Sequence, residues 1–395
     1  MMRIIPLLLI SLSLSSCWMA RGYRVKDFNL TDHERMPYVT IKKSDRAQPF
    51  AEARDTFKYA GITSYLDSTL PSSHTAAFLV IKNDSIVYER YYNGFNSSSL
   101  LPSFSVAKSF VGTLMGVAID EGKISSTTES ITKYLPELLK RDKRFAHITI
   151  QHLMDMRSGI KFNEGTYNAK DDAIRLGFRP NLLKYAFKLE IERAPGTYKY
   201  QSINTELLAL IIERATGKKI SAYLQEKLWQ PLGAEYNATW NVDSRKRQQE
   251  IAFAGLNATA RDFAKLGRLY LHNGKWNGHT VLSPRWITAV NNVDSMRTVN
   301  YYHNQWWSRP EYKYFKDSLS AISFVKQTGI QSGVQNTRNG FRVSYRNGAF
   351  SAHGILNQYV YINPKSDVII VRLGRYWNHP SLGAVQFVYH IGGMF

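Results

Sequence analysis

The sequence is poor in cysteine. Its 395 residues include a single one, Cys17, close to the N-terminus. One cysteine cannot form an internal disulfide, and it excludes a cysteine-ligated metal site. If Cys17 serves as an anchor, as argued below, a nucleophile in the folded part of the chain must be another residue type.

Acidic residues are also scarce. The chain has 51 Lys and Arg against 31 Asp and Glu, a formal net charge of +20. Such a charge suits nucleic acid, but the basic residues are scattered and no zinc-finger or RNA-binding motif accompanies them. We therefore expect no nucleic-acid partner. Attraction to anionic lipid surfaces is favoured, with a merely solvated basic exterior as the alternative.

The N-terminal apolar run is too short to span a membrane. One positive charge at Arg3 precedes apolar residues 4–14 and small residues before Cys17, which is typical of a secretory signal. Leu14-Ser-Ser-Cys17 resembles the bacterial lipobox, in which the cysteine is lipidated. We expect a lipoprotein signal over 1–17, a tether over 18–55 and a folded domain over 56–395, exported and lipid-anchored to the bacterial cell envelope. An ordinary signal peptide is the alternative.

Strand patterns stand at both ends of the folded region. Hairpins are predicted over 75–92 and 358–373, and helical periods over 105–121, 205–216 and 259–274. This order predicts an α+β fold: N- and C-terminal strands form one mainly antiparallel sheet flanked by helices, beside a mainly helical lobe. A cleft between lobe and sheet is where we expect the chemistry.

A Ser-x-x-Lys motif opens the most apolar of these helices. Ser105 and Lys108 are one helical turn apart and share a helix face. At a helix start, free backbone N–H groups can stabilise an alkoxide or oxyanion, and a lysine against the core can be a neutral base. Ser105 is then either a nucleophile with Lys108 as its base or only the polar start of an apolar helix.

The same spacing occurs three more times, so it does not decide the question alone. Ser130/Lys133 lies in a polar connection, which indicates a turn or a cap. Ser158/Lys161 has a glycine directly after the serine, which is typical of a helix end. Ser323/Lys326 lies in strand-like alternation, where residues three apart face opposite sides. Ser105 is the strongest of the four.

Four blocks, in order along the chain, together resemble a known family. They are S-V-A-K-S-F from Ser105, I-T-I-Q-H-L-M-D-M-R-S-G over 148–159, A-P-G-T-Y-K-Y-Q-S-I-N-T-E-L-L-A-L-I-I-E-R-A-T-G over 194–217 and A-G-L-N-A-T-A-R-D-F-A-K-L-G over 254–267. The blocks resemble the class C β-lactamase-like serine hydrolases, which include class C β-lactamases, penicillin-binding proteins, certain esterases and 6-aminohexanoate-dimer hydrolase. The resemblance implies the β-lactamase/transpeptidase-like fold.

The resemblance also implies residue roles. Ser105 would be acylated, Lys108 would help to take its proton, and Tyr200 would complete the relay, with Ser202 where the family usually has Asn; Tyr198 is the nearby alternative. The family's Lys-Thr-Gly is missing, and Ser351-Ala-His-Gly354-Ile355 stands in its place. This resembles the Gly-Ile variant of the aminohexanoate branch, so the backbone N–H groups of Ser105 and Ile355 would form the oxyanion hole, next to Gly354.

Five residues are candidates for lining the substrate cleft: Ser202 and Gly354 of the motifs above, and His353, Trp306 and Trp307. His353 accompanies no glycine-elbow serine and no metal-binding spacing, so a structural or cleft-lining role is expected. Trp306 and Trp307 belong to a Gln-Trp-Trp block that resembles the same branch, and either line the cleft or pack in the core.

The sequence thus predicts a serine hydrolase that acts on a small ester or amide and needs no metal or cofactor. A penicillin-recognising protein of the same fold, acting on peptidoglycan peptides or weakly on β-lactams, is one alternative. A non-catalytic binding protein of that fold is the other.

Overall fold

The computed structural model describes residues 28–166, 168, 170–291, 301–328, 333–345 and 348–395. The chain forms two compact units, each built from two separate stretches. The first unit comprises Met1–Gln48 and Ser98–Thr259, and the second comprises Pro49–Ser97 and Ala260–Phe395. Two of the chain's crossings between the units, after Ser97 and after Thr259, fall within the domain predicted over 56–395, and each unit is described by itself.

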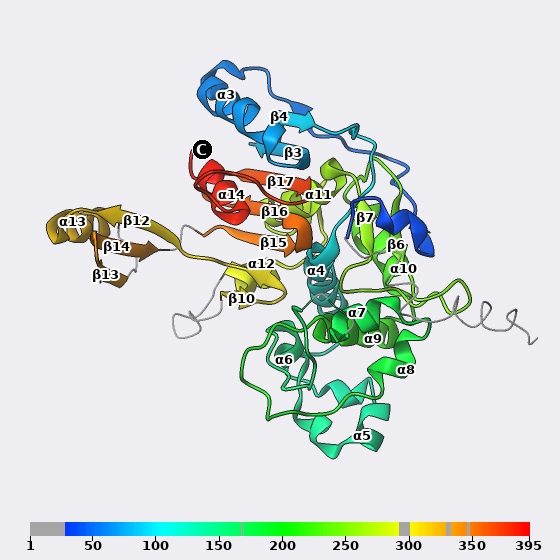
Figure 1. The fold of residues 1–395 in the computed structure, drawn as a ribbon. Helices are drawn as coiled ribbons and strands as arrows, with labels where there is room; N and C mark the ends of the chain where they lie inside the picture. The colour runs from blue at the N-terminus through cyan, green and yellow to red at the C-terminus, as the bar shows by residue number, and fades with distance from the viewer. Residues whose placement is uncertain (1–27, 167, 169, 292–300, 329–332, 346–347) are drawn as a thin grey trace, which may run out of the picture. The chain divides into compact units, whose positions relative to one another are not determined.

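An eight-stranded sheet is the centre of the second unit (Figure 1). Its order is β10-β11-β15-β16-β17-β3-β4-β2, and its neighbours pair antiparallel except for the parallel pair β2–β4. The early hairpin β3–β4 joins the late hairpin β16–β17 through β17 and β3. The predicted α+β fold with a sheet shared by both chain ends is confirmed. The strands are β2 (Ala51–Glu52), β3 (Thr75–Lys82), β4 (Ser85–Tyr91), β10 (Tyr302–His303), β11 (Trp306–Trp307), β15 (Phe350–Gly354), β16 (Gln358–Asn363) and β17 (Val368–Gly374).

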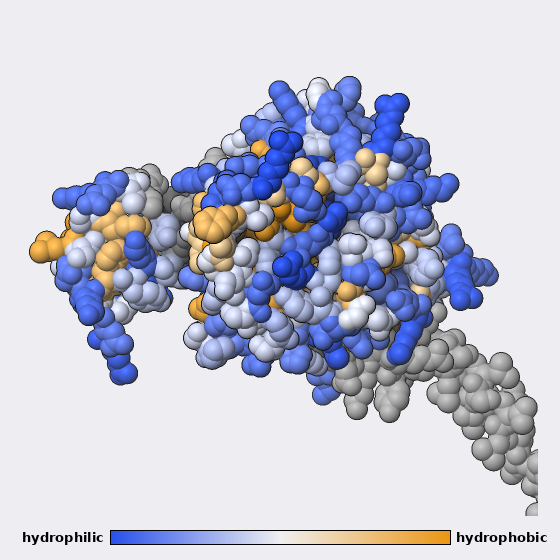
Figure 2. Space-filling model, turned by 90° about the horizontal axis from the view of Figure 1, so that it is seen from above, coloured by the Kyte–Doolittle hydropathy of each residue, from blue (hydrophilic) through white to orange (hydrophobic). Residues whose placement is uncertain are grey.

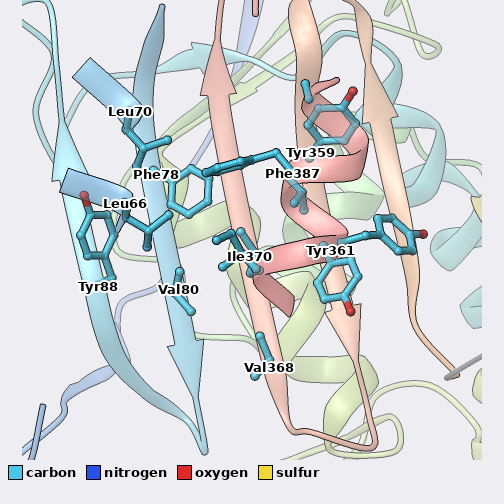
Figure 3. Packing of buried hydrophobic residues seen from close by; sticks show 14 of the residues in the cluster. Leu66, Leu70, Phe78, Val80, Tyr88, Tyr359, Tyr361, Val368, Ile370 and Phe387 are labelled. Carbon is cyan, nitrogen blue, oxygen red and sulfur yellow. The ribbon is translucent and has the colours of Figure 1, made fainter. Parts of the chain in front are cut away.

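Helices cover both faces of this sheet. Every residue of β17 is buried, as expected of a central strand in a sheet that is covered by helices on both faces. Helix α11 (Ala260–Leu271) packs on β16 and β17, with Gly267 close against Ile369, while α14 (Ala384–Gly392) packs on the same strands with Gly392 close against Tyr361. The α14 face holds Phe78, Val80, Ile370 and Phe387 in one apolar cluster, to which helix α3 (Ala60–Thr69) adds Leu66 (Figure 3).

The second unit also contains a small three-stranded sheet with one helix packed against it. Strands β12 (Glu311–Phe315), β14 (Gly340–Tyr345) and β13 (Gly333–Thr337) form a three-stranded sheet, against which α13 (Ser318–Thr328) packs. Apolar side chains of this region, such as the exposed Leu319 and Ile322, reach its surface (Figure 2). The strand predicted around Ser323 is wrong, because Ala321 and Phe324 lie three apart and turn toward the sheet as helix positions do. The second unit also contains α12 (Pro284–Asn291) and the hairpin β8 (Lys275–Trp276)–β9 (His279–Thr280).

The first unit is mainly helical, as predicted for the middle of the chain. Helix α4 packs on α9, and α9 also contacts α6 (Figure 1). Gly217 ends α9 in the left-handed conformation, at the predicted stop. The helices are α4 (Ala107–Asp120), α5 (Glu137–Arg141), α6 (Ile150–Met154), α7 (Asp172–Phe178), α8 (Leu182–Ala186), α9 (Ser202–Thr216) and α10 (Ile220–Leu224).

A four-stranded sheet in the first unit was not predicted. Its order is β1-β6-β7-β5, from β1 (Tyr38–Ile41), β6 (Ala238–Asn241), β7 (Leu256–Ala258) and β5 (Leu101–Pro102). The predicted tether over 18–55 is wrong for β1 and β2, because β1 pairs with β6 over its whole length and β2 pairs with β4. In the described residues no helix is long and apolar enough to cross a membrane.

Candidate active site

Ser105 lies where the four-stranded sheet leads into α4. Strand β5 pairs with β7, and the N–H of Ser103 donates to the carbonyl of Leu256 at 2.9 Å. A single 3-10 turn, Phe104–Val106, then carries Ser105 directly into α4. Phe104 has a φ of 44°, a conformation that non-glycine residues adopt at a cost. The half-buried Ser105 therefore stands at a helix start on a constrained backbone.

Lys108 is buried beside this serine. Its side chain is 1% exposed, and its Nζ donates to Ser105 Oγ at 2.8 Å and to the Phe253 carbonyl at 3.1 Å. Burial lowers the pKa of Lys108 to about 8, although the carboxyl groups of Glu164 and Glu206 oppose this shift. A lysine with such a pKa is neutral in part of the molecules near neutral pH and can accept a proton.

The remaining Ser-x-x-Lys pairs have other partners. Ser130 caps a short turn, and its hydroxyl accepts from the Thr132 N–H. Ser158 Oγ donates to Asn204 at 2.7 Å, and Ser323 Oγ accepts from Gln327 at 3.0 Å. All four pairs lie in the described part of the chain, where Ser105/Lys108 alone shows a lysine–serine hydrogen bond.

Tyr200 joins the pair from the residues just before α9. Lys108 Nζ lies 5.2 Å from the centroid of its ring and 5.3 Å from that of Phe253. The structure therefore brings together three of the predicted residues: Ser105, Lys108 and Tyr200. Tyr198, the alternative tyrosine, lies half-buried two residues earlier.

Two carboxyl groups near Lys108, those of the half-buried Glu164 and the buried Glu206, were missed from the sequence. Glu164 accepts from the N–H and the hydroxyl of Ser202, and Glu206 accepts from the Ala252 N–H at 2.9 Å. Burial raises the pKa of Glu164, and raises that of Glu206 well above its usual value. The position of Glu206 inside the apolar run of α9 was the available signal, whereas Glu164 stands in a loop and gives none.

The predicted residues of the 306–307 and 353–355 stretches belong to the second unit. The half-buried His353 bonds through Nε2 to Ser351 Oγ at 2.7 Å and stacks on Trp307, with ring centroids 5.4 Å apart. Burial and the nearby Arg309 hold the pKa of His353 well below its usual value. Trp306 is 1% exposed, and its Nε1 donates to the Tyr270 hydroxyl at 3.1 Å, so its ring is part of the core packing.

Gly354 and Ile355 lie at the end of β15. Gly354 pairs with Gln358 of β16, and Ile355 begins the one-turn helix Ile355–Asn357. The pairing of its N–H with that of Ser105 in an oxyanion hole stays a prediction.

The sequence analysis also predicts that the protein has no metal site and that it is lipidated at Cys17. No group of three or more His, Cys, Asp or Glu within the described ranges could hold a metal ion. Cys17, the predicted lipidation site, lies outside the described residues.

The chain is similar to proteins named 6-aminohexanoate-dimer hydrolase. A 6-aminohexanoate-dimer hydrolase of Paenarthrobacter ureafaciens is 27% identical over 361 residues, which cover 88% of this chain and 84% of the relative. The solved structure of a candidate 6-aminohexanoate-dimer hydrolase from Bacillus anthracis matches with a TM-score of 0.70 at 25% identity, covering 91% of this chain and 90% of the other.

The fold is also that of class C β-lactamases. The structure of one such enzyme covers 87% of this chain and is itself covered completely, with a TM-score of 0.59 at 17% identity. The Beta-lactamase family model matches residues 69–382. The chain therefore belongs to the β-lactamase family of hydrolases.

Proposed function

We propose that the protein is a serine hydrolase that cleaves small esters or amides through an acyl-enzyme. Ser105 is the nucleophile, Lys108 is its base, and Tyr200 takes part in the proton relay. The observation that carries the proposal is the hydrogen bond of 2.8 Å between the buried Lys108 Nζ and Ser105 Oγ. A nucleophile and its base within this distance are what acyl transfer requires.

The chemistry follows from these positions. Ser105 Oγ attacks the substrate carbonyl carbon and its proton passes to the neutral Lys108. The bond to the leaving alcohol or amine then breaks, and the Lys108–Tyr200 pair returns the proton to that group. Water attacks the resulting ester of Ser105 and releases the acid. The backbone N–H groups of Ser105 and Ile355 are the proposed hydrogen-bond donors to the oxyanion, both during acylation of Ser105 and during hydrolysis of the acyl-enzyme.

A small amide or ester is the substrate class that the relatives favour. The relative from Paenarthrobacter ureafaciens is named for the hydrolysis of a 6-aminohexanoate dimer. Without Lys-Thr-Gly, this chain lacks the lysine of that motif as a partner for a β-lactam carboxylate. We therefore place amide and ester hydrolysis before penicillin recognition.

The test uses the purified protein with a fluorophosphonate probe, a p-nitrophenyl ester and the 6-aminohexanoate dimer. We expect labelling and ester turnover that Ser105→Ala abolishes. Ser323→Ala is the matched control, since it removes the serine of another Ser-x-x-Lys pair, on the exposed side of α13. Labelling that survives Ser105→Ala would overturn the proposal.

Two further outcomes separate the alternatives. Stable acylation of Ser105 by labelled penicillin, without ester turnover, would favour a penicillin-recognising protein. A folded protein that reacts with none of these compounds would favour a binding protein, and the proposed hydrolase would then be wrong.

A further inference from the structure

The residues that follow Tyr200 are fixed to a second segment of the first unit, Ile160–Glu164. The buried Gln201 donates from its Nε2 to the carbonyls of Ile160 and Phe162, both at 2.9 Å. Four residues upstream of this segment, Met156 accepts from the Lys199 N–H at 2.8 Å. The residues on both sides of Tyr200, Lys199 through its main chain and Gln201 through its side chain, are therefore held by residues 156–164.

Glu164 makes the strongest of these attachments. Its Oε2 accepts from the Ser202 N–H at 2.5 Å, and its Oε1 accepts from the Ser202 hydroxyl at 2.6 Å. Ser202 is the first residue of the 15-residue helix α9, whose N-terminus favours a negative charge. Hydrogen bonds to a carboxylate are stronger than those between neutral groups, so Glu164 fixes the start of α9 and with it the preceding Tyr200.

The same carboxylate acts electrostatically on Lys108. The ionisable groups that face Lys108 are Glu164, Glu206 and Tyr200, and Glu164 is in addition influenced by Asp171. Burial raises the pKa of Glu206 well above its usual value, which favours its neutral form. Burial also raises the pKa of Glu164, but its hydrogen bonds to Ser202 at both oxygens and its attraction to Lys108 oppose this shift and favour its charged form.

We propose that Glu164 is a positioning residue of the Ser105–Lys108–Tyr200 site. It holds the turn that carries Tyr200 and places a negative charge near the Lys108 ammonium. The inference rests on the proposed function, because it assigns to Glu164 the tuning of that base. It also gives Ser202 a role: its side chain is a donor to Glu164.

The test measures the rate of fluorophosphonate labelling of Ser105 between pH 5 and 10, since this needs no knowledge of the natural substrate. Glu164→Gln removes the charge that raises the pKa of Lys108, so the acid limb of the profile should move down by about one pH unit. The maximal rate should fall about tenfold, because the Gln amide cannot accept both Ser202 bonds. The shift of the limb is a readout that a purely structural role would not produce.

Three more variants separate the two effects. Ser202→Ala keeps the charge and the backbone bond, so we expect a several-fold slower rate with an unmoved limb. Glu164→Asp keeps the charge on a shorter side chain and should also leave the limb unmoved, which serves as a test if Glu164→Gln does not fold. Glu190→Gln is the control, because Glu190 is an exposed glutamate paired with Arg141 and Lys161, and it should change neither quantity.

An unmoved acid limb in folded Glu164→Gln, or a downward shift in Glu164→Asp, would overturn the inference. Failure of the wild-type protein to label at Ser105 would instead overturn the proposed function. The two failures are therefore distinguishable.

Discussion

The two units each bury a cation, and they treat it differently. In the first unit Lys108 is 1% exposed and has two hydrogen-bond acceptors, a hydroxyl and a carbonyl, with glutamates nearby. In the second unit Arg372 is 0% exposed and donates to four carbonyls and a hydroxyl. Burial lowers both pKa values, to about 8 for Lys108 and about 10 for Arg372.

The acceptors of Arg372 come from three separate segments. Its guanidinium binds the Ser73 carbonyl and the Thr75 hydroxyl before and at β3, the Leu356 and Asn357 carbonyls, and the Tyr376 carbonyl. Leu356 and Asn357 have φ values of 59° and 65°, which cost free energy in non-glycine residues. Arg372 therefore fixes a strained turn, the one that begins at Ile355.

Lys108 and Arg372 differ in whether they can lose their proton near physiological pH. A guanidinium whose pKa is about 10 stays charged at physiological pH, so Arg372 contributes structure. A lysine whose pKa is about 8 changes its charge in the range where enzymes work, so Lys108 is suited to its proposed role as a base. Burial alone does not single out a candidate catalytic residue; what distinguishes Lys108 is a titratable amine hydrogen-bonded to the proposed nucleophile Ser105.

The largest expected effect is on catalysis at Lys108. Lys108→Met keeps the side-chain length but removes the base, so ester turnover should fall by about 10³- to 10⁴-fold. The thermal midpoint should not fall, because the buried charge is removed together with its desolvation penalty. Turnover within tenfold of wild type would show that Lys108 is no more catalytic than Arg372.

The next effect is on stability at Arg372. Arg372→Met leaves buried carbonyls unpaired, and we expect a loss of about 3 kcal/mol in the free energy of unfolding, measured with urea. The control is Arg90→Met in the same sheet, whose half-exposed ion pair with Asp67 should be worth less than about 1 kcal/mol. Equal losses of unfolding free energy in the two variants would show that Arg372 has no special structural role.

Some of this organisation could be predicted from the sequence, because it is encoded locally. The two hairpins carry strand alternation and turn residues, and the Ser-x-x-Lys spacing places Lys108 on the face of Ser105. Around Ser323, by contrast, a short alternating stretch was compatible with a strand, and the decision for helix came from packing of Phe324 on Phe315 and Tyr345.

The unpredicted parts depend on contacts between distant residues. β1 is a strand because it pairs with β6, about 200 residues later in the chain. The polar composition of residues 18–55, which include β1, suggested a tether instead. The bonds between Glu164 and Ser202 join residues 38 positions apart in the chain, and the acceptors of Arg372 span from Ser73 to Tyr376. Such partners carry no local signal.

A third prediction compares Tyr200, whose ring lies near Lys108, with Tyr198, two residues earlier in the chain. Tyr200→Phe should reduce ester turnover by about 10²-fold, because the ring stays while the hydroxyl proposed to relay the proton is lost. Tyr198→Phe is the matched control and should remain within about twofold of wild type. The reverse pattern in the kinetics would move the proton relay to Tyr198.

The smallest effect is the pH dependence that separates Lys108 from a permanently charged group. Lys108 acts as a base only when neutral, and its pKa of about 8 makes the neutral fraction fall about tenfold for each pH unit below that value. We therefore expect kcat/KM for a p-nitrophenyl ester to rise about tenfold from pH 6 to pH 7 and to level off above pH 8. A profile that is flat between pH 6 and pH 8 would mean that the Lys108 ammonium does not lose its proton for catalysis, and Lys108 would then resemble Arg372, a buried cation that holds its neighbours in place.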